Sequence, residues 1–241
     1  MPVDSPRNRI APIAEDQWGL ITRRQALNAG VSQTTLDRLT TEGGDLRRVG
    51  YAVYQLVGAP EPDHLELRVA WLQLAPAIPA WERDPKNGVV SHRSAAEMYG
   101  IGSLPADRHD FTVDRRRQTR QPNIRLHTRP LADHDWIRLR GLPVTLPSRI
   151  ASDLLHDQED PEAVANVIAD AIRRVFDYPS SFAEALRPHA YRFRLRRGDG
   201  LGLLRWLLEL VGDPQTAVWL RDAQTDDQPS SAPRPSPGAT P

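Results

Sequence analysis

Several polar side chains between Arg23 and Arg48 are of the kinds that bind duplex DNA. Glutamine can pair with adenine, arginine with guanine or phosphate, and serine or threonine with either, from the first turns of a helix in the major groove. Three such residues stand together at the start of one predicted helix. The predicted DNA-binding residues are Arg23, Ser32, Gln33, Thr34, Arg38, Arg47 and Arg48.

Two short helices joined by a glycine turn would position these side chains. Thr22 and Gln25 form a capping-box pattern, which predicts a helix start. Gly30 can adopt the left-handed conformation that ends that helix, and Ser32 can cap the next one. The second helix is predicted over residues 33–41, with polar residues facing outward and leucines facing inward.

Residues 46–57 are predicted to form a tight β-hairpin, with Arg47 and Arg48 on its first strand. A basic hairpin beside a recognition helix is typical of a wing that contacts the phosphate backbone. For the two helices alone, the alternative is a helical corner that only packs other elements together. The basic hairpin favours DNA binding by residues 9–57.

Catalysis and metal binding have weaker support. Ser91 and His92 suggest a Ser/His pair, but we expect adjacent side chains to point apart and find no acidic residue placed to orient the imidazole. Ser91 is therefore predicted to cap a helix. Arginine-rich neighbours favour salt-bridged loops over a nuclease-like cluster for Asp110, Asp114, Asp133 and Asp135. We assign no catalytic residue, metal ligand or cofactor site, and predict that the protein is not an enzyme.

An arginine-rich block between residues 108 and 140 is the second candidate site, with nine arginines against four aspartates. In the predicted strands 123–128 and 136–140, arginines alternate with apolar residues, so pairing of these strands would place the arginines on one exposed face. The alternative is a solvated face neutralised by the acidic stretch at residues 157–162. The predicted partner-binding residues are Arg115, Arg116, Arg117, Arg125 and Arg138.

The composition limits other classes of function. The 241 residues carry a formal net charge of zero, but residues 153–184 hold eight acidic residues against two arginines, so charge is segregated. The absence of cysteine excludes disulfides, thiol catalysis and cysteine-ligated zinc. No apolar leader and no run of about 18–20 apolar residues is present, so we expect a cytoplasmic protein without a membrane partner. Lys86 is the single lysine, which reflects either codon bias or a need for the forked contacts of arginine.

The period of the hydrophobic pattern predicts an α/β (α+β) fold with two domains. Residues 9–58 would form an N-terminal winged helix-turn-helix, and residues 63–212 a larger mixed α/β domain, separated at the prolines of segment 58–62. The polar terminal segments, 1–8 and 222–241, are predicted to be disordered. In the larger domain, the predicted helices cover 63–75, 93–99, 148–157, 162–176, 181–190 and 199–212, and the predicted strands cover 111–114, 123–128, 136–140 and 142–146.

The motif GLITRRQALNAGVSQTTLDRL, followed by LRRVGYAVYQL, resembles the N-terminal winged helix of the AbiEi family of antitoxins from type IV toxin–antitoxin and abortive-infection systems. The later motifs VVSHRSAAEMYGI, FTVDRRR, IRLHTRPL and GLPVTLPSRIASDLL resemble successive segments of the family's larger domain, so the resemblance covers residues 16–211. It implies a transcriptional autorepressor that binds double-stranded DNA at repeats in its own promoter and opposes a co-encoded nucleotidyltransferase-like toxin. A DNA-targeted nuclease or nucleotide-transferring enzyme that uses the second domain is the alternative.

Overall fold

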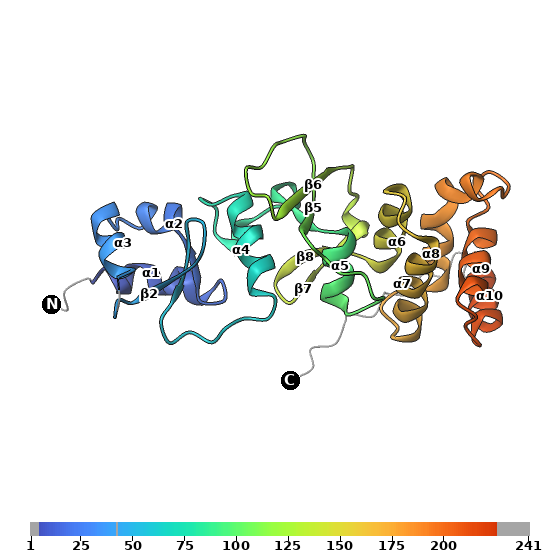
Figure 1. Ribbon diagram of the computed structural model, residues 1–241, viewed down its shortest axis with the longest axis horizontal. Helices are drawn as coiled ribbons and strands as arrows, with labels where there is room; N and C mark the ends of the chain where they lie inside the picture. Colours follow the sequence, from blue (N-terminus) through green and yellow to red (C-terminus); the bar gives the residue numbers. More distant parts are fainter. Residues whose placement is uncertain (1–4, 42, 226–241) are drawn as a thin grey trace. The chain divides into compact units, whose positions relative to one another are not determined.

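The computed structural model describes residues 5–41 and 43–225 of the chain (Figure 1). Within these ranges the protein is a mixed α/β structure with two sheets, in the orders β1-β3-β2 and β6-β5-β4-β8-β7. The chain divides into two compact units. The first contains the residues up to Val89 together with Phe111–Pro130, and the second contains Val90–Asp110 together with the residues from Leu131 onward.

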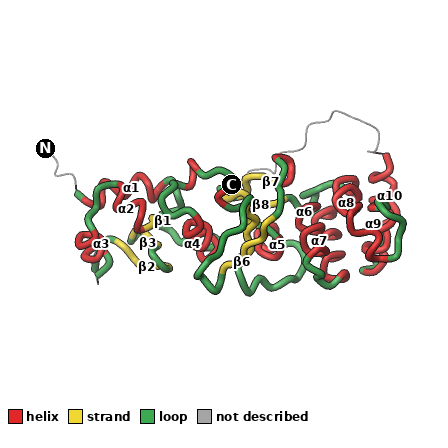
Figure 2. Tube along the Cα trace, turned by 90° about the horizontal axis from the view of Figure 1, so that it is seen from above, coloured by secondary structure: helices red, strands yellow, loops and turns green. Residues whose placement is uncertain are grey.

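The first unit begins with three helices and a small antiparallel sheet (Figure 2). Its elements are α1 (Pro6–Glu15), β1 (Leu20–Thr22), α2 (Arg23–Asn28), α3 (Gln33–Leu39), β2 (Leu46–Gly50), β3 (Val53–Leu56), α4 (Leu65–Leu74), the 3-10 turns η1 (Ala80–Glu82) and η2 (Pro85–Asn87), and β6 (Ile124–Thr128). β4 (Val89–Val90) and β5 (His109–Val113) lie where the chain passes from one unit to the other.

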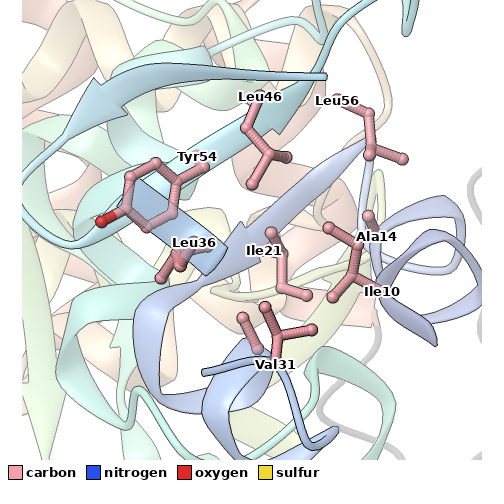
Figure 3. Close-up of a cluster of buried hydrophobic side chains, with 9 residues drawn as sticks. Ile10, Ala14, Ile21, Val31, Leu36, Leu46, Tyr54 and Leu56 are labelled. Carbon is pink, nitrogen blue, oxygen red and sulfur yellow. The ribbon is translucent and has the colours of Figure 1, made fainter. Parts of the chain in front are cut away.

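One face of the first sheet packs against the N-terminal helices (Figure 3). The register pairs Ile21 with Tyr54 and Leu46 with Leu56, so these four side chains share that face. Full burial of an aliphatic side chain contributes about 1.5–3 kcal/mol relative to exposure, so this cluster holds α2 and α3 against the sheet. The helical and turn residues of the cluster are Ile10, Ala14, Ala26, Val31 and Leu36.

The opposite face of the same sheet is covered by α4. Leu20 and Gln55 are partners across β1 and β3, and both are buried. α4 contacts all three strands, and a Cβ added to Gly50 would lie 2.5 Å from Cγ1 of Val69. The sheet is therefore a layer with helices on both faces: α1–α3 pack on one face and α4 packs on the other.

A buried glutamine pair joins the N-terminal helices to residues 76–80. Nε2 of Gln17 donates to Oε1 of Gln25 at 2.7 Å, and Nε2 of Gln25 donates to the carbonyl of Ile78 at 3.1 Å. The hydroxyl of Thr22 donates to the carbonyl of Pro76. Buried polar groups need such partners. The boundary predicted at residues 58–62 thus lies inside the first unit, whose packing continues to residue 89.

Two arginines bind the carbonyl groups at the C-terminal end of α4. Arg83 donates to the carbonyls of Leu72 and Ala75, at 2.8 Å each, and Arg117 donates to that of Leu74 at 3.3 Å. Cations stabilise a helix at this end because its carbonyls are partly negative. Burial, and secondly the charge of Arg117, lower the pKa of Arg83 to about 9, so its guanidinium remains protonated at pH 7.

The second unit is built mainly of helices. Contacts join α6 with α7 and α8, and join α9 with α7, α8 and α10; Figures 1 and 2 show these helices side by side. β8 pairs with β4 in parallel and with β7 in antiparallel orientation. The remaining elements are α5 (His92–Tyr99), η3 (Asp133–Asp135), β7 (Trp136–Leu139), β8 (Leu142–Thr145), α6 (Pro147–His156), α7 (Pro161–Arg173), α8 (Pro179–Leu186), η4 (Arg187–Phe193), α9 (Gly200–Leu210) and α10 (Thr216–Thr225).

Most of the predicted elements correspond to observed ones, but two short strands were missed and both ends of the chain differ from the prediction. β1, β4 and α10 were not predicted. α1 begins at Pro6 because Ser5 caps it and proline suits the first helical turn, so residues 6–8 are helical where disorder was expected. α10 reaches Thr225, so residues 222–225 are helical too. The rest of the two predicted disordered segments, 1–4 and 226–241, lies outside the described residues.

Across the residues that the structure describes, no helix is both long and apolar enough to cross a membrane.

Candidate nucleic-acid interface

The turn between α2 and α3 forms as its local sequence predicts. The backbone N–H of Gln25 donates to Oγ1 of Thr22 at 3.1 Å, and the N–H of Thr22 donates to Oε1 of Gln25 at 2.9 Å, which completes the capping box. Gly30 adopts a left-handed conformation with a φ of 79°. Ser32 is the N-cap of α3. These local interactions set the angle at which α3 leaves the body of the unit.

The side chain of Ser32 is occupied by α3 itself. Its hydroxyl accepts a hydrogen bond from the N–H of Thr35 at 3.2 Å and donates one to Oγ1 of Thr35 at 2.8 Å. A hydroxyl has a single proton to donate, so Ser32 has none left for a phosphate oxygen in this arrangement. Ser32 therefore caps the helix in this structure, and its predicted DNA contact stays a prediction.

The exposed surface of α3 carries the other predicted reading residues. Thr34 and Arg38 are exposed, and among the described residues neither side chain has a hydrogen-bond or ion-pair partner. Nε2 of Gln33 instead donates to Oδ1 of Asp37 at 2.6 Å. The polar groups on this surface are therefore the hydroxyl of Thr34, the guanidinium of Arg38, and the amide of Gln33, which is hydrogen-bonded to Asp37.

The two arginines of the hairpin lie on opposite faces of the sheet. Arg48 pairs with Tyr54 in the register and so shares the face covered by α1–α3, whereas Arg47 pairs with Gln55 on the other face. Arg47 donates to Oε1 of Gln55 at 2.6 Å and forms an exposed ion pair of 3.1 Å with Glu61. Because the two arginines lie on opposite faces, a DNA backbone on one side of the hairpin would contact only one of them directly. Arg48 lies on the face of the sheet against which α3 packs, so Arg48 is the better candidate.

Arg23 lies at the start of α2 and links this helix to the hairpin. Its side chain is exposed, and its backbone N–H donates to the carbonyl of Ala52 at 2.8 Å. Ala52 occupies the turn between β2 and β3 with a φ of 54°, a left-handed conformation that is unusual for alanine. The position of the hairpin is therefore coupled to that of α2.

The predicted partner-binding arginines are divided between the two units: Arg138 belongs to the second, and the other four belong to the first. The strands β6 and β7, which carry Arg125 and Arg138, are the first and last in the order of their sheet, so the pairing on which a shared arginine face depended does not occur. Arg117 is half-buried and donates to backbone carbonyls, as described above. Arg115 and Arg116 are exposed, and Arg115 lies 3.7 Å from the carboxylate of Asp114. Of the predicted set, these two are the clearest solvent-facing pair.

The sequence-based argument against a Ser/His pair was wrong in its geometry. Oγ of Ser91 lies 2.9 Å from Nδ1 of His92, and Nε2 of His92 lies 3.8 Å from a carboxylate oxygen of Asp157. Ser91 occupies the predicted N-cap position of α5, but its side chain makes no capping hydrogen bond. Ser91 has no exposed surface and His92 has 2%. A nucleophile must reach its substrate, so this arrangement does not form an accessible catalytic site.

A second Ser/His contact, also missed from the sequence, joins α6 to η4. Oγ of Ser152 lies 2.9 Å from Nε2 of His189, which is 6% exposed. The two residues are far apart in the chain, so no local motif could have indicated the contact. Its burial favours a packing role between the two helical segments.

A comparison with protein families assigns the N-terminal segment. Residues 8–57 match the family model described as "Transcriptional regulator, AbiEi antitoxin". This match confirms the predicted family for that segment, which extends from α1 to the residue after β3 and contains every predicted DNA-binding residue. The resemblance predicted for residues beyond 57 is not covered by the match and stays a prediction. No curated protein matches the chain.

Proposed function

We propose that residues 8–57 form a winged helix that binds double-stranded DNA and that the protein regulates transcription of its own operon. The observation that carries this proposal is the match of these residues to AbiEi transcriptional regulators. In the proposed complex, α3 lies in the major groove and the β2–β3 hairpin contacts the phosphate backbone. The operator would be repeats in the promoter, and the protein would act in the cytoplasm.

The geometry of the segment supports this docking. α2, the left-handed Gly30 and α3 form two capped helices joined by a sharp turn, and the hairpin follows within one antiparallel sheet. The exposed side chains of Thr34 and Arg38 lie on α3, where side chains can reach base edges. Arg48 lies on the sheet face that packs against the helices.

The family further supports a role as an antitoxin. The protein would oppose a co-encoded, nucleotidyltransferase-like toxin and would have no catalytic activity of its own. The rival function, a DNA-targeted nuclease or nucleotide-transferring enzyme, gains no support from Ser91 and His92, because both are buried.

Fluorescence anisotropy with the full chain tests DNA binding. The protein is titrated into a labelled duplex of its own promoter and a scrambled duplex of equal length, at several salt concentrations. We expect tighter binding to the promoter, and a decrease of log affinity with log salt of about 0.9 per phosphate neutralised. Few cations face outward on this segment, so the slope should correspond to only a few phosphates. Equal binding to both duplexes, or none at low salt, would contradict the proposal.

A further inference from the structure

A cavity in the first unit lies at the hairpin turn, away from the exposed surface of α3. It has a volume of about 270 Å³ and is lined by residues of three segments: 51–53 at the turn, 73–76 at the end of α4, and 117–126. Sites for small molecules usually have volumes of about 300–1,000 Å³. The cavity lies just below this range, so it suits only a compact ligand.

The lining combines an apolar wall with positive charge. Leu74, Ile124 and Leu126 supply aliphatic surface, and Tyr51 supplies an aromatic ring at the rim. Arg117 and Arg120 also line the cavity, whereas no Asp or Glu is found among its described lining residues. This combination suits a ligand with an anionic group on a compact apolar body, because arginine binds carboxylates through two parallel hydrogen bonds.

The two arginines differ in how firmly they are held. Arg117 is fixed by its hydrogen bonds to the carbonyls of Leu74, at 3.3 Å, and Asn87, at 2.7 Å. Arg120 is exposed, and within the described part of the chain its side chain has no hydrogen-bond or ion-pair partner. Arg120 is thus available to close on an anion, while Arg117 supplies a charge that is already in place.

The walls of the cavity are hydrogen-bonded to the proposed DNA-binding elements. Ala52 accepts from the backbone N–H of Arg23 at 2.8 Å, and Pro76 accepts from the hydroxyl of Thr22. Nε2 of Gln73 donates to the carbonyl of Tyr51 at 3.0 Å. A ligand in the cavity would therefore contact residues that hold the start of α2 and the hairpin turn.

We propose that this cavity is an effector site for a small aromatic or branched aliphatic carboxylate, and that its occupation weakens DNA binding. The bound anion would add negative charge beside the hairpin that carries Arg48, which reduces attraction to phosphates. The effect on DNA rests on the proposed function, whereas ligand binding does not. Coupling of this kind is reciprocal, so DNA would weaken ligand binding by the same factor.

Benzoate is a suitable probe, with benzamide as a neutral ligand of the same shape and inorganic phosphate as an anion without an apolar body. Binding to the full chain is followed by two-dimensional NMR at constant ionic strength. We expect saturable shifts with benzoate at millimolar concentration, and at least fivefold weaker binding of benzamide and phosphate. Arg120→Ala should weaken benzoate binding at least fivefold. Arg116→Ala changes an exposed arginine that does not line the cavity and should have no effect.

Equal binding of benzoate and benzamide, or unchanged binding of benzoate to Arg120→Ala, would overturn the effector site. A second measurement repeats the promoter titration with saturating benzoate or equimolar chloride. We expect a loss of affinity of about threefold or more in the wild type, and Arg120→Ala should need at least fivefold more benzoate to show the same loss. Benzoate binding without this loss would overturn the coupling. A protein that binds benzoate through Arg120 but binds no DNA would refute the proposed function and leave the ligand site standing.

Discussion

The side-chain amide of Gln33 donates a 2.6 Å hydrogen bond to the carboxylate of Asp37, one turn later on α3. Both residues lie on the helix that we propose to read DNA. Asp37 is exposed, so in the proposed complex it would place a negative charge near the phosphates, and it occupies one of the two N–H groups of the Gln33 amide. In the proposed complex Asp37 would therefore oppose DNA binding in two separable ways.

Replacing Asp37 by alanine should strengthen DNA binding. The change removes repulsion from the phosphates and frees the second N–H of the Gln33 amide, so that the amide can bind a base with both of its polar atoms. We expect affinity to rise severalfold for the promoter and less for a scrambled duplex, measured by anisotropy at two salt concentrations.

Asp37→Asn separates the two effects, because asparagine loses the charge but keeps an oxygen that can accept from Gln33. It should strengthen binding to both duplexes equally, without a gain in promoter preference. Weaker binding by Asp37→Ala would show that the carboxylate itself contacts a base, such as the amino group of cytosine.

Gln33→Ala and Thr34→Ala should lower the preference for the promoter. A good base contact contributes about 1–3 kcal/mol of discrimination, so the ratio of promoter to scrambled affinity should fall by about fivefold or more where such a contact is lost. Binding to the scrambled duplex should change little. The proposed docking of α3 would be wrong if both variants kept the promoter preference of the wild type.

Arg48→Ala should weaken binding to every duplex, whereas Arg47→Ala should have a much smaller effect. The reason is that Arg48 lies on the face of the sheet next to the helices, while Arg47 lies on the other face with Gln55 and Glu61. Loss of one phosphate contact should reduce the salt slope by about 0.9. The measurement is the anisotropy titration at four salt concentrations. A larger effect of Arg47→Ala would place the DNA on the other side of the hairpin.

Tyr99→Phe in the second unit should leave stability unchanged or raise it. The Tyr99 hydroxyl is buried and has no hydrogen-bond partner among the described residues, and burial together with the charge of Asp177 raises its pKa. Leaving a polar group unsatisfied costs about 1–3 kcal/mol, and phenylalanine removes the group while keeping the ring. Urea unfolding of both proteins measures the difference. A loss of more than about 1 kcal/mol would mean that the hydroxyl makes a stabilising bond.

Local chemistry predicted much of the proposed DNA-binding segment. The capping box of Thr22 and Gln25, the left-handed Gly30 and the N-cap Ser32 each depend on residues within three positions of one another, so a single sequence reveals them. Strand alternation could also have separated Arg47 from Arg48, since neighbours on a strand point to opposite faces. The alternation alone thus places Arg47 and Arg48 on opposite faces of the hairpin.

Contacts between distant segments could not be predicted in this way. The hydrogen bond from Gln25 to the carbonyl of Ile78 extends the first unit past the proline segment, and no local pattern marks it. The contact of His92 with Asp157 likewise joins residues from separate helical regions. Such contacts depend on how helices and strands pack, and the hydrophobic period of each element alone does not determine that packing.

The arginine pair at positions 115 and 116 gives the sharpest test of the proposed antitoxin role. The sequence suggested that Arg117 belongs to the same surface. Arg117, however, donates to the carbonyls of Leu74 and Asn87, so its replacement would disturb the end of α4. If all three charges were reversed, a loss of partner binding could not be distinguished from damage to the fold at Arg117. The test variant should therefore keep Arg117.

The double variant Arg115→Glu, Arg116→Glu should fold normally but fail to neutralise the co-encoded toxin. Exposed substitutions usually change stability by less than about 0.5 kcal/mol each, whereas two reversed charges should repel an acidic partner that two guanidinium groups attract. Growth during co-expression with the toxin is measured beside thermal unfolding, with Arg115→Lys, Arg116→Lys as the control that keeps the charge. Full rescue by the reversed variant would mean that this arginine pair is a solvated surface and that the toxin binds elsewhere.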